Sequence, residues 1–186
     1  MPINLTVEQQ DLAEMLGDVW SGIAPGDDVW PSIRELGLTE IPFPEAAGGA
    51  DGTFRDLTVV MTGLGRTLGS APYFSSVVMA GLALLEAADR DTREEVLPGI
   101  VSGARTAALV CGPGIASSAI RGEVVGEREL LLSGVQHAVV DGQSAELLVV
   151  VVTNGSDGTE LALVEGSAPG VRRTVGEQLD GTRQLA

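Results

Sequence analysis

Apolar residues recur at two different spacings along this chain, and the spacing changes near residue 103. Before this point, apolar positions follow one another at intervals of three and four, which is typical of helices buried on one face. Beyond it, short apolar runs rich in β-branched residues alternate with Gly, Asn, Asp and Ser, as in strands joined by turns. The pattern predicts a helical segment followed by a β segment.

Start and stop signals divide the helical segment. Thr6 is expected to cap the first helix, Thr53 precedes the apolar run of the third, and Asp91 with Glu94 resembles a capping box for the last one. Glycine follows several of the apolar stripes, as is common at helix ends. The expected helices cover residues 6–19, about 27–37, 53–69, 70–85 and 91–102.

The β segment contains short apolar runs and hairpin signals. Asn154-Gly155 and Asp157-Gly158 lie between two of the later runs, where an antiparallel hairpin needs a tight turn. The expected strands cover residues 106–110, 119–125, 129–132, 136–140, 146–152, 161–164 and 170–175.

Segregation of the two element types predicts the α+β class, because parallel βαβ folds would alternate them. We expect a small helical domain over residues 1–104 and an antiparallel, incomplete β-barrel domain over residues 105–186. A doubly wound dinucleotide-binding fold is disfavoured, since no GxGxxG follows a strand.

Charge narrows the classes of partner. The net charge is -15, with 26 acidic against 11 basic residues, which repels polyanions and argues against nucleic acid. The apolar stretches are too short to span a bilayer, so no membrane span is expected. The amino terminus lacks the apolar stretch of a signal peptide, and the lone Cys111 cannot form an internal disulfide, which favours a cytoplasmic location.

Few residues could carry chemistry by themselves. The single His137 and single Cys111 argue against a metal cluster and a Ser-His-Asp triad. His137, in a β run, is expected to be a packed or hydrogen-bonded structural residue, and Cys111 a buried one. The segment 41–52, IPFPEAAGGADG, is either an interhelical loop or a functional one, with the structural role favoured.

An ordered series of motifs resembles the acyl-CoA dehydrogenase family. Residues 36–52, LGLTEIPFPEAAGGADG, followed by a helix that ends in GLGRTL at residues 63–68, are similar to the family's amino-terminal domain. Further matching motifs follow in order, namely APY at 71–73, LPGIVSG at 97–103, AALV at 107–110, LSG at 132–134, DG at 141–142, AELL at 145–148 and LDGTR at 179–183. The resemblance covers nearly the whole chain.

The resemblance implies a helical domain, a β-barrel domain and a further helical domain, with FAD and an acyl-CoA substrate between them. The family removes a proton from the α-carbon of an acyl thioester and passes a hydride from the β-carbon to flavin N5. The chain ends at Ala186, within the region similar to the middle domain. The helical domain with the family's usual catalytic glutamate is therefore expected to be absent, and no catalytic or metal-binding residue is assigned.

Two flavin-contacting segments depart from the family pattern. The TEPxxGSD segment corresponds to residues 111–118, CGPGIASS, which keep Pro113 and a serine but lose the threonine and glutamate. The GxKxWIT strand corresponds to residues 134–140, GVQHAVV, where Ala138 replaces the aromatic residue and Val140 the hydroxyl. The expected flavin-facing positions, mainly through backbone groups, are Val110, Cys111, Pro113, Ser117, Ser118, His137, Ala138 and Val140.

Three interpretations remain open. The chain is a piece of a dehydrogenase that binds FAD with the rest of its polypeptide, or a degenerate subunit that pairs with a catalytic partner, or a non-enzymatic interaction module on this scaffold. Heteromeric members of the family that act on steroid side chains are a precedent for the second, which the altered flavin residues favour. An incomplete barrel leaves an open strand edge and apolar surface, so we expect a homo-oligomer or a partner subunit.

Overall fold

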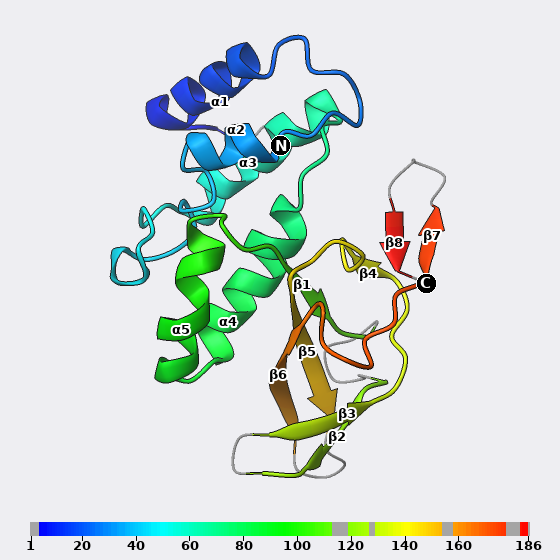
Figure 1. Cartoon of the computed structure of the whole chain (residues 1–186). Coiled ribbons are helices and arrows are strands. Elements are labelled where there is room, and N and C mark those ends of the chain that lie inside the picture. Colours follow the sequence, from blue (N-terminus) through cyan, green and yellow to red (C-terminus); the bar gives the residue numbers. More distant parts are fainter. Residues whose placement is uncertain (1–3, 113–118, 127–128, 154–157, 178–182, 186) are drawn as a thin grey trace.

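The computed structural model of the chain describes residues 4–112, 119–126, 129–153, 158–177 and 183–185. Its helices lie in the first part of the sequence and its strands in the second (Figure 1). The expected α+β class is confirmed. Within the described ranges, no helix combines the length and the apolar character that crossing a membrane requires.

The elements have the following bounds. The helical elements are α1 (Val7–Val19), α2 (Trp30–Glu35), the 3-10 helix η1 (Glu45–Ala47), α3 (Phe54–Thr67), the π-helix η2 (Phe74–Gly81), α4 (Leu82–Ala87) and α5 (Arg90–Val101). The strands are β1 (Ala107–Val110), β2 (Arg121–Val124), β3 (Leu130–Ser133), β4 (Val139–Val140), β5 (Leu147–Thr153), β6 (Thr159–Glu165), β7 (Val175–Glu177) and β8 (Arg183–Leu185).

The expected cap at Thr6 is confirmed, and Thr53 also caps a helix. Thr6 and Gln9 form a reciprocal capping box at the start of α1, and Thr53 and Asp56 form another at the start of α3. Gln9 Nε2 also donates to Asp56 Oδ1 at 2.9 Å, which joins the two helix starts. The hydrogen bonds that Asp56 accepts, first of all from the Thr53 side chain, lower the pKa of its carboxyl.

Two helix boundaries differ from the prediction. Helix α5 is capped by Asp89, which accepts from the Thr92 N–H at 2.8 Å, whereas the predicted capping box of Asp91 and Glu94 does not form. Glu94 instead pairs with Arg90 Nε at 2.7 Å, one turn away. Helix α3 ends at Thr67, two residues before the expected end at residue 69, because Leu68 takes a left-handed conformation with φ 54°.

The helix expected over residues 70–85 is a π-helix, η2, that continues into α4. In a π-helix, residues five apart come close together. A Cβ at Gly81 would lie 2.6 Å from Phe43 Cζ and 3.0 Å from the backbone oxygen of Ser76, so only glycine fits there. The wider turn places Ser75 and Ser76 on the buried side of η2.

The main sheet has the order β1-β5-β6 and is mixed. The expected hairpin is confirmed, since β5 and β6 pair in antiparallel fashion from Leu147 opposite Glu165 to Thr153 opposite Thr159. The other described strand pairs are antiparallel as expected, and the pair of β1 with β5 is parallel, which the sequence did not indicate. The β2–β3 hairpin and β4 lie between β1 and β5 in the sequence and supply the long crossover that a parallel pair needs.

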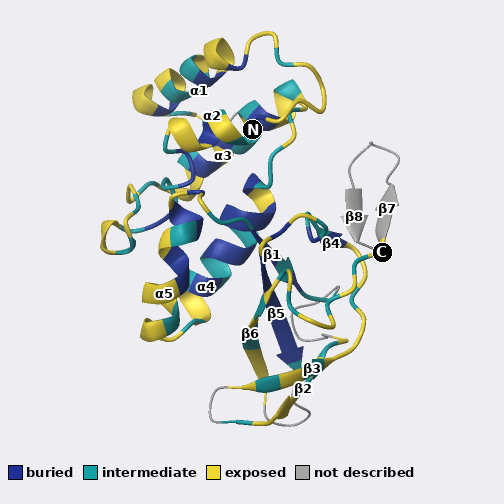
Figure 2. Ribbon diagram, viewed as in Figure 1, coloured by how far each residue is buried: buried dark blue, intermediate teal, exposed yellow. Residues whose placement is uncertain are grey.

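The central strand of the main sheet, β5, is buried on both faces. Along β5, residues 147–152 are all buried, which explains their unbroken apolar run, LLVVVV. Ala107, Leu147 and Val149 belong to the core that the helices share, whereas Val110 and Val150 belong to a second core on the opposite face. Figure 2 shows β5 as a buried strand beside the partly exposed β6. The helical core thus extends past residue 104, into the first strand.

The described strands form three separate sheets and no closed barrel. Besides the main sheet, β2 pairs with β3, and β8 pairs with both β4 and β7. The last expected strand, residues 170–175, is replaced by β7 at 175–177, and β8 was not expected as a strand. The incomplete barrel is therefore confirmed for the described residues.

The loop at residues 41–52 is held by backbone contacts. Phe43 is completely buried, and its carbonyl oxygen accepts from the Asp51 N–H at 2.9 Å. Gly48 has φ 82° as the residue that ends η1, and a Cβ on Gly49 would overlap the Phe43 carbonyl. Each of the two glycines is thus required for its own steric reason, the positive φ at Gly48 and the close backbone contact at Gly49. This fits the favoured structural role of the loop.

We expect Gly49→Ala to lower the free energy of unfolding by about 2 kcal/mol or more, because the added methyl overlaps backbone that cannot move independently. Gly17 lies within α1 with open space around its Cα, so Gly17→Ala should raise stability by roughly 0.5–1 kcal/mol. Urea denaturation of both variants measures the contrast. Equal effects of the two substitutions would contradict the steric explanation.

Candidate functional site

The first predicted flavin segment begins at the end of β1. Val110 is the last residue of this strand and is 7% exposed, packed in the second core. Cys111 follows as a half-buried free thiol. Three of the predicted positions, Pro113, Ser117 and Ser118, lie outside the described residues.

The second predicted segment is mostly not a strand. Only Val139 and Val140 of the expected strand 136–140 form β4. His137 was expected to be packed or hydrogen-bonded; it is exposed and so not packed, and its backbone carbonyl oxygen accepts from Gln136 Nε2 at 3.0 Å. Ala138 is also exposed, with φ 59°, and Val140 is half-buried. Two left-handed residues, Ala138 and Asp141, therefore bracket the short strand.

The fold brings the two segments together. Strands β1 and β4 contact one another, and Val110 and Val139 belong to the same core cluster. The end of β1 thus lies beside β4, although 28 positions separate Val110 from Ala138 in the numbering. This neighbourhood supplies aliphatic side chains and backbone groups, with Gln136 and His137 as the nearby polar side chains of the second segment.

Sequence reasoning missed a polar link at this place. Ser75 Oγ donates to Asp141 Oδ2 at 2.6 Å, between residues 66 positions apart. Ser75 is completely buried, and Asp141 directly follows β4 with φ 51°. The Asp141-Gly142 turn is visible in the sequence, but no local signal marks Ser75 as its partner.

Burial raises the pKa of the Asp141 carboxyl, and the hydrogen bond from Ser75 acts in the opposite direction. The single hydroxyl proton of Ser75 has two acceptors within reach, Asp141 Oδ2 and the Pro72 carbonyl oxygen at 3.1 Å. A protonated Asp141 can donate to Ser75 Oγ, which leaves the serine proton for Pro72. With Asp141 protonated, Ser75 Oγ and the Pro72 carbonyl oxygen each accept a hydrogen bond at the same time.

The neighbouring serine makes a second link to the β segment. Ser76 Oγ donates to the Ala107 carbonyl oxygen at 2.9 Å and accepts from the Ala107 N–H at 2.8 Å. Both residues are completely buried, so these bonds satisfy backbone groups at the edge of β1 that water cannot reach. Helix η2 is thereby fixed to the start of β1 through Ser76 and to the end of β4 through Ser75.

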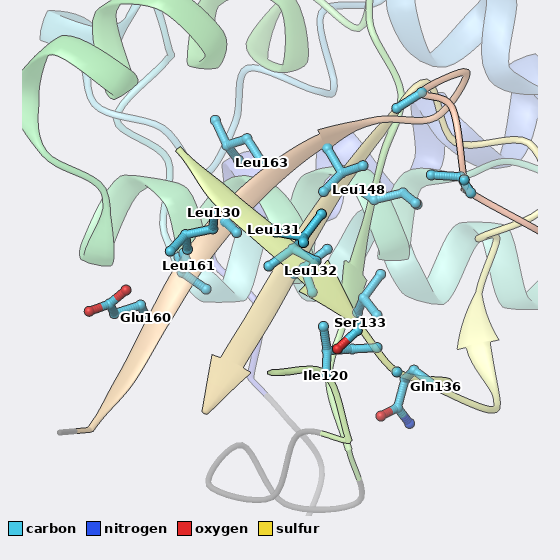
Figure 3. A pocket seen from close by; sticks show the side chains of 18 of the residues that line it. Ile120, Leu130, Leu131, Leu132, Ser133, Gln136, Leu148, Glu160, Leu161 and Leu163 are labelled. Atoms are coloured by element: carbon cyan, nitrogen blue, oxygen red, sulfur yellow. The ribbon is translucent and has the colours of Figure 1, made fainter. Parts of the chain in front are cut away.

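A groove of about 1260 Å³, lined by both apolar and polar residues, lies between the β2–β3 hairpin and the main sheet (Figure 3). Leu130 and Leu132 of β3 face Leu148 of β5 across it, and Figure 3 places Gln136 toward one end. The Oε1 atom of Gln136 is buried without a hydrogen-bond partner. The leucines of β3 and β5 form the apolar part of this groove.

The chain belongs to the acyl-CoA dehydrogenase family. The family's sequence profile for "Acyl-CoA dehydrogenase, N-terminal domain" matches residues 9–104. The resemblance seen in the motifs is thus confirmed, and with it the oxidoreductase class of the family.

Two curated relatives extend the match into the β segment. Acyl-CoA dehydrogenase FadE28 of Mycobacterium tuberculosis is 27% identical over 173 residues, which are 92% of this chain and 48% of that protein. Cyclohexane-1-carbonyl-CoA dehydrogenase of Geobacter metallireducens is 32% identical over 156 residues, 78% of this chain and 40% of the relative. The chain thus spans about half the length, or less, of the curated relatives it matches.

Solved structures share the fold. The ChsE4-ChsE5 complex from Mycobacterium tuberculosis aligns with TM-score 0.79 at 22% identity, over 100% of this chain and 57% of that one. A variant of the Tcur3481-Tcur3483 steroid ACAD aligns with TM-score 0.80 at 26% identity, over 96% and 54%. The glutaryl-coenzyme A dehydrogenase complex with glutaryl-CoA aligns with TM-score 0.82 at 18% identity, over 100% and 54%.

We expect Asp141→Asn to stabilise the protein increasingly as the pH rises. A raised carboxyl pKa means that the folded state holds this proton more tightly than the unfolded chain, so its contribution is lost as the pH rises from the usual value of 3.8 through the folded-state pKa. Asparagine accepts a positive φ, and its amide can donate to Ser75 as the protonated acid does.

Urea denaturation of wild type and Asp141→Asn between about pH 4 and pH 7 measures the difference in unfolding free energy. The other carboxyl groups are present in both proteins, so their contributions to the pH dependence of the unfolding free energy cancel in this difference. Asp51→Asn is the control for the backbone, because Asp51 also has φ 51° but is exposed. An Asp141→Asn gain that does not grow with pH, or an equal gain in Asp51→Asn, would contradict the expectation.

Proposed function

We propose that this chain is the amino-terminal and middle region of a flavoprotein subunit that works within a heteromeric acyl-CoA dehydrogenase. The observation that carries the proposal is the contact between β1 and β4, since one segment that resembles the family's flavin contacts follows β1 directly and the other ends in β4. FAD, when bound, accepts the hydride that leaves the acyl β-carbon.

The residues present fit a flavin through backbone and apolar contacts. Val110 and Cys111 at the end of β1 and Ala138 to Val140 at β4 would hold it. The left-handed Ala138 is exposed, so its backbone is open to a ligand. Ala138 and Val140 offer no side-chain donor, however, and alanine offers little surface on which a ring can stack. We therefore expect this chain alone to bind FAD weakly and to be inactive.

The heteromeric state is supported by two of the structural relatives, which are described as the ChsE4-ChsE5 complex and the Tcur3481-Tcur3483 steroid ACAD. Exposed apolar residues of this chain also support a partner subunit, since Leu131 of β3 is 60% exposed and Leu163 of β6 is 37% exposed. The proposed substrate class is an acyl-CoA thioester of lipid or steroid origin, and the proposed location is the cytoplasm. Two other interpretations are a piece of a self-sufficient dehydrogenase and a non-enzymatic module. Measuring FAD binding distinguishes them from the proposal and from each other.

A fluorescence titration with FAD tests the proposal, on the purified chain and on the chain co-expressed with a neighbouring dehydrogenase subunit. We expect tight binding only with the partner. Tight, stoichiometric binding by the chain alone would favour a piece of a self-sufficient enzyme. Absence of binding in both preparations would favour the non-enzymatic module.

Val140→Thr sharpens this test, because it restores a hydroxyl at the position that resembles the family's threonine while keeping the side-chain shape. We expect it to tighten FAD binding by roughly 2- to 12-fold, the value of one net hydrogen bond. Val124→Thr is the matched control, since Val124 is 71% exposed on β2. An equal change in both variants, or none in Val140→Thr, would show that β4 does not face the flavin.

A further inference from the structure

We infer that Ser75 and Asp141 are positioning residues for the flavin-facing strand: their hydrogen bond holds β4 in place against the helical segment. The inference rests on the proposed function, because β4 matters for catalysis only if it faces FAD. It assigns a role to two residues, one in a helix and one in a turn, that lie outside the segments similar to the family's flavin contacts.

Strand β4 needs such a link because it is short and bracketed by strained backbone. It contains only Val139 and Val140, and it pairs with β8. Ala138 and Asp141 on either side have φ of 59° and 51°, a region that costs non-glycine residues free energy. Such conformations persist only where the surroundings determine them, and two ladder pairs supply little of that constraint.

Asp141 is well placed to supply the missing constraint on β4. Its carboxylate accepts from Ser75 Oγ at 2.6 Å, and Ser75 is completely buried. Because Asp141 is covalently next to Val140, a backbone displacement at Asp141 moves the last residue of β4. A backbone displacement of about 1 Å is enough to weaken a positioned contact considerably.

The other end of the link is itself fixed. Ser75 lies in η2, and the adjacent Ser76 makes two hydrogen bonds to Ala107 at the start of β1. One turn of the π-helix thus holds both strands that carry the proposed flavin contacts, β1 through Ser76 and β4 through Ser75. Removing one hydroxyl should loosen one strand and spare the other.

Amide hydrogen exchange on the ligand-free chain tests this selectivity. We expect Ser75→Ala to raise exchange in peptides covering 138–142 by about tenfold more than in peptides covering 107–110. Ser76→Ala is the matched control, an identical change one residue away, and should reverse the pattern. Asp141→Asn should leave the exchange of 138–142 near the wild-type level, since its amide can bond with Ser75.

Flavin affinity supplies the second measurement, in the co-expressed complex. We expect Ser75→Ala to weaken FAD binding by about tenfold and Asp141→Asn to keep it within about twofold. If Ser75→Ala does not fold, Asp141→Gly removes the same bond and accepts the φ of 51° without strain.

Equal exchange in both peptide regions, unchanged FAD affinity in Ser75→Ala, or an Asp141→Asn variant as impaired as Ser75→Ala would overturn the inference. Failure of the proposed function looks different: wild type then binds no FAD with or without its partner. In that case the exchange pattern still decides whether Ser75 and Asp141 hold β4.

Discussion

The rest of the structure depends on the burial of β5 on both faces. A strand that is apolar along its whole length must be covered from both sides, and here the helices cover one side while the β2–β3 hairpin and β4 lie on the other. This requirement makes the first strand part of the helical core through Ala107. The helical and β segments consequently share one hydrophobic core at the main sheet.

The two cores differ in how completely they are closed. On the helical side the residues with the largest side chains, among them Phe43, Leu97 and Ile100, are fully buried. On the other side, Leu130 and Leu132 line an open groove with Leu148. Leaving these leucine side chains in contact with water costs free energy. Association with further polypeptide would cover them, in agreement with the proposed heteromeric subunit.

Polar contacts at the junction are few and specific. Ser75 and Ser76 reach the β segment from one turn of η2, amid otherwise apolar packing. Buried hydrogen bonds add modest net stability, but an unpaired group in such a place is costly, so they select one arrangement of the strands over its neighbours. At the proposed flavin-facing positions Ala138 and Val140 offer no side-chain donor, whereas the Ser75–Asp141 hydrogen bond beside β4 is present.

The sequence by itself determined the element types and most of their positions. The threonine caps of α1 and α3, the β5–β6 hairpin and the family motifs are local signals, readable from neighbouring residues. It misplaced the start of α5, because Asp89 and Asp91 are equally good caps and only the packed helix chooses between them. The parallel β1–β5 pair, the meeting of β1 with β4 and the Ser75–Asp141 bond were decided by the tertiary structure. These contacts join residues tens of positions apart, and burial selects them, so no local pattern encodes them.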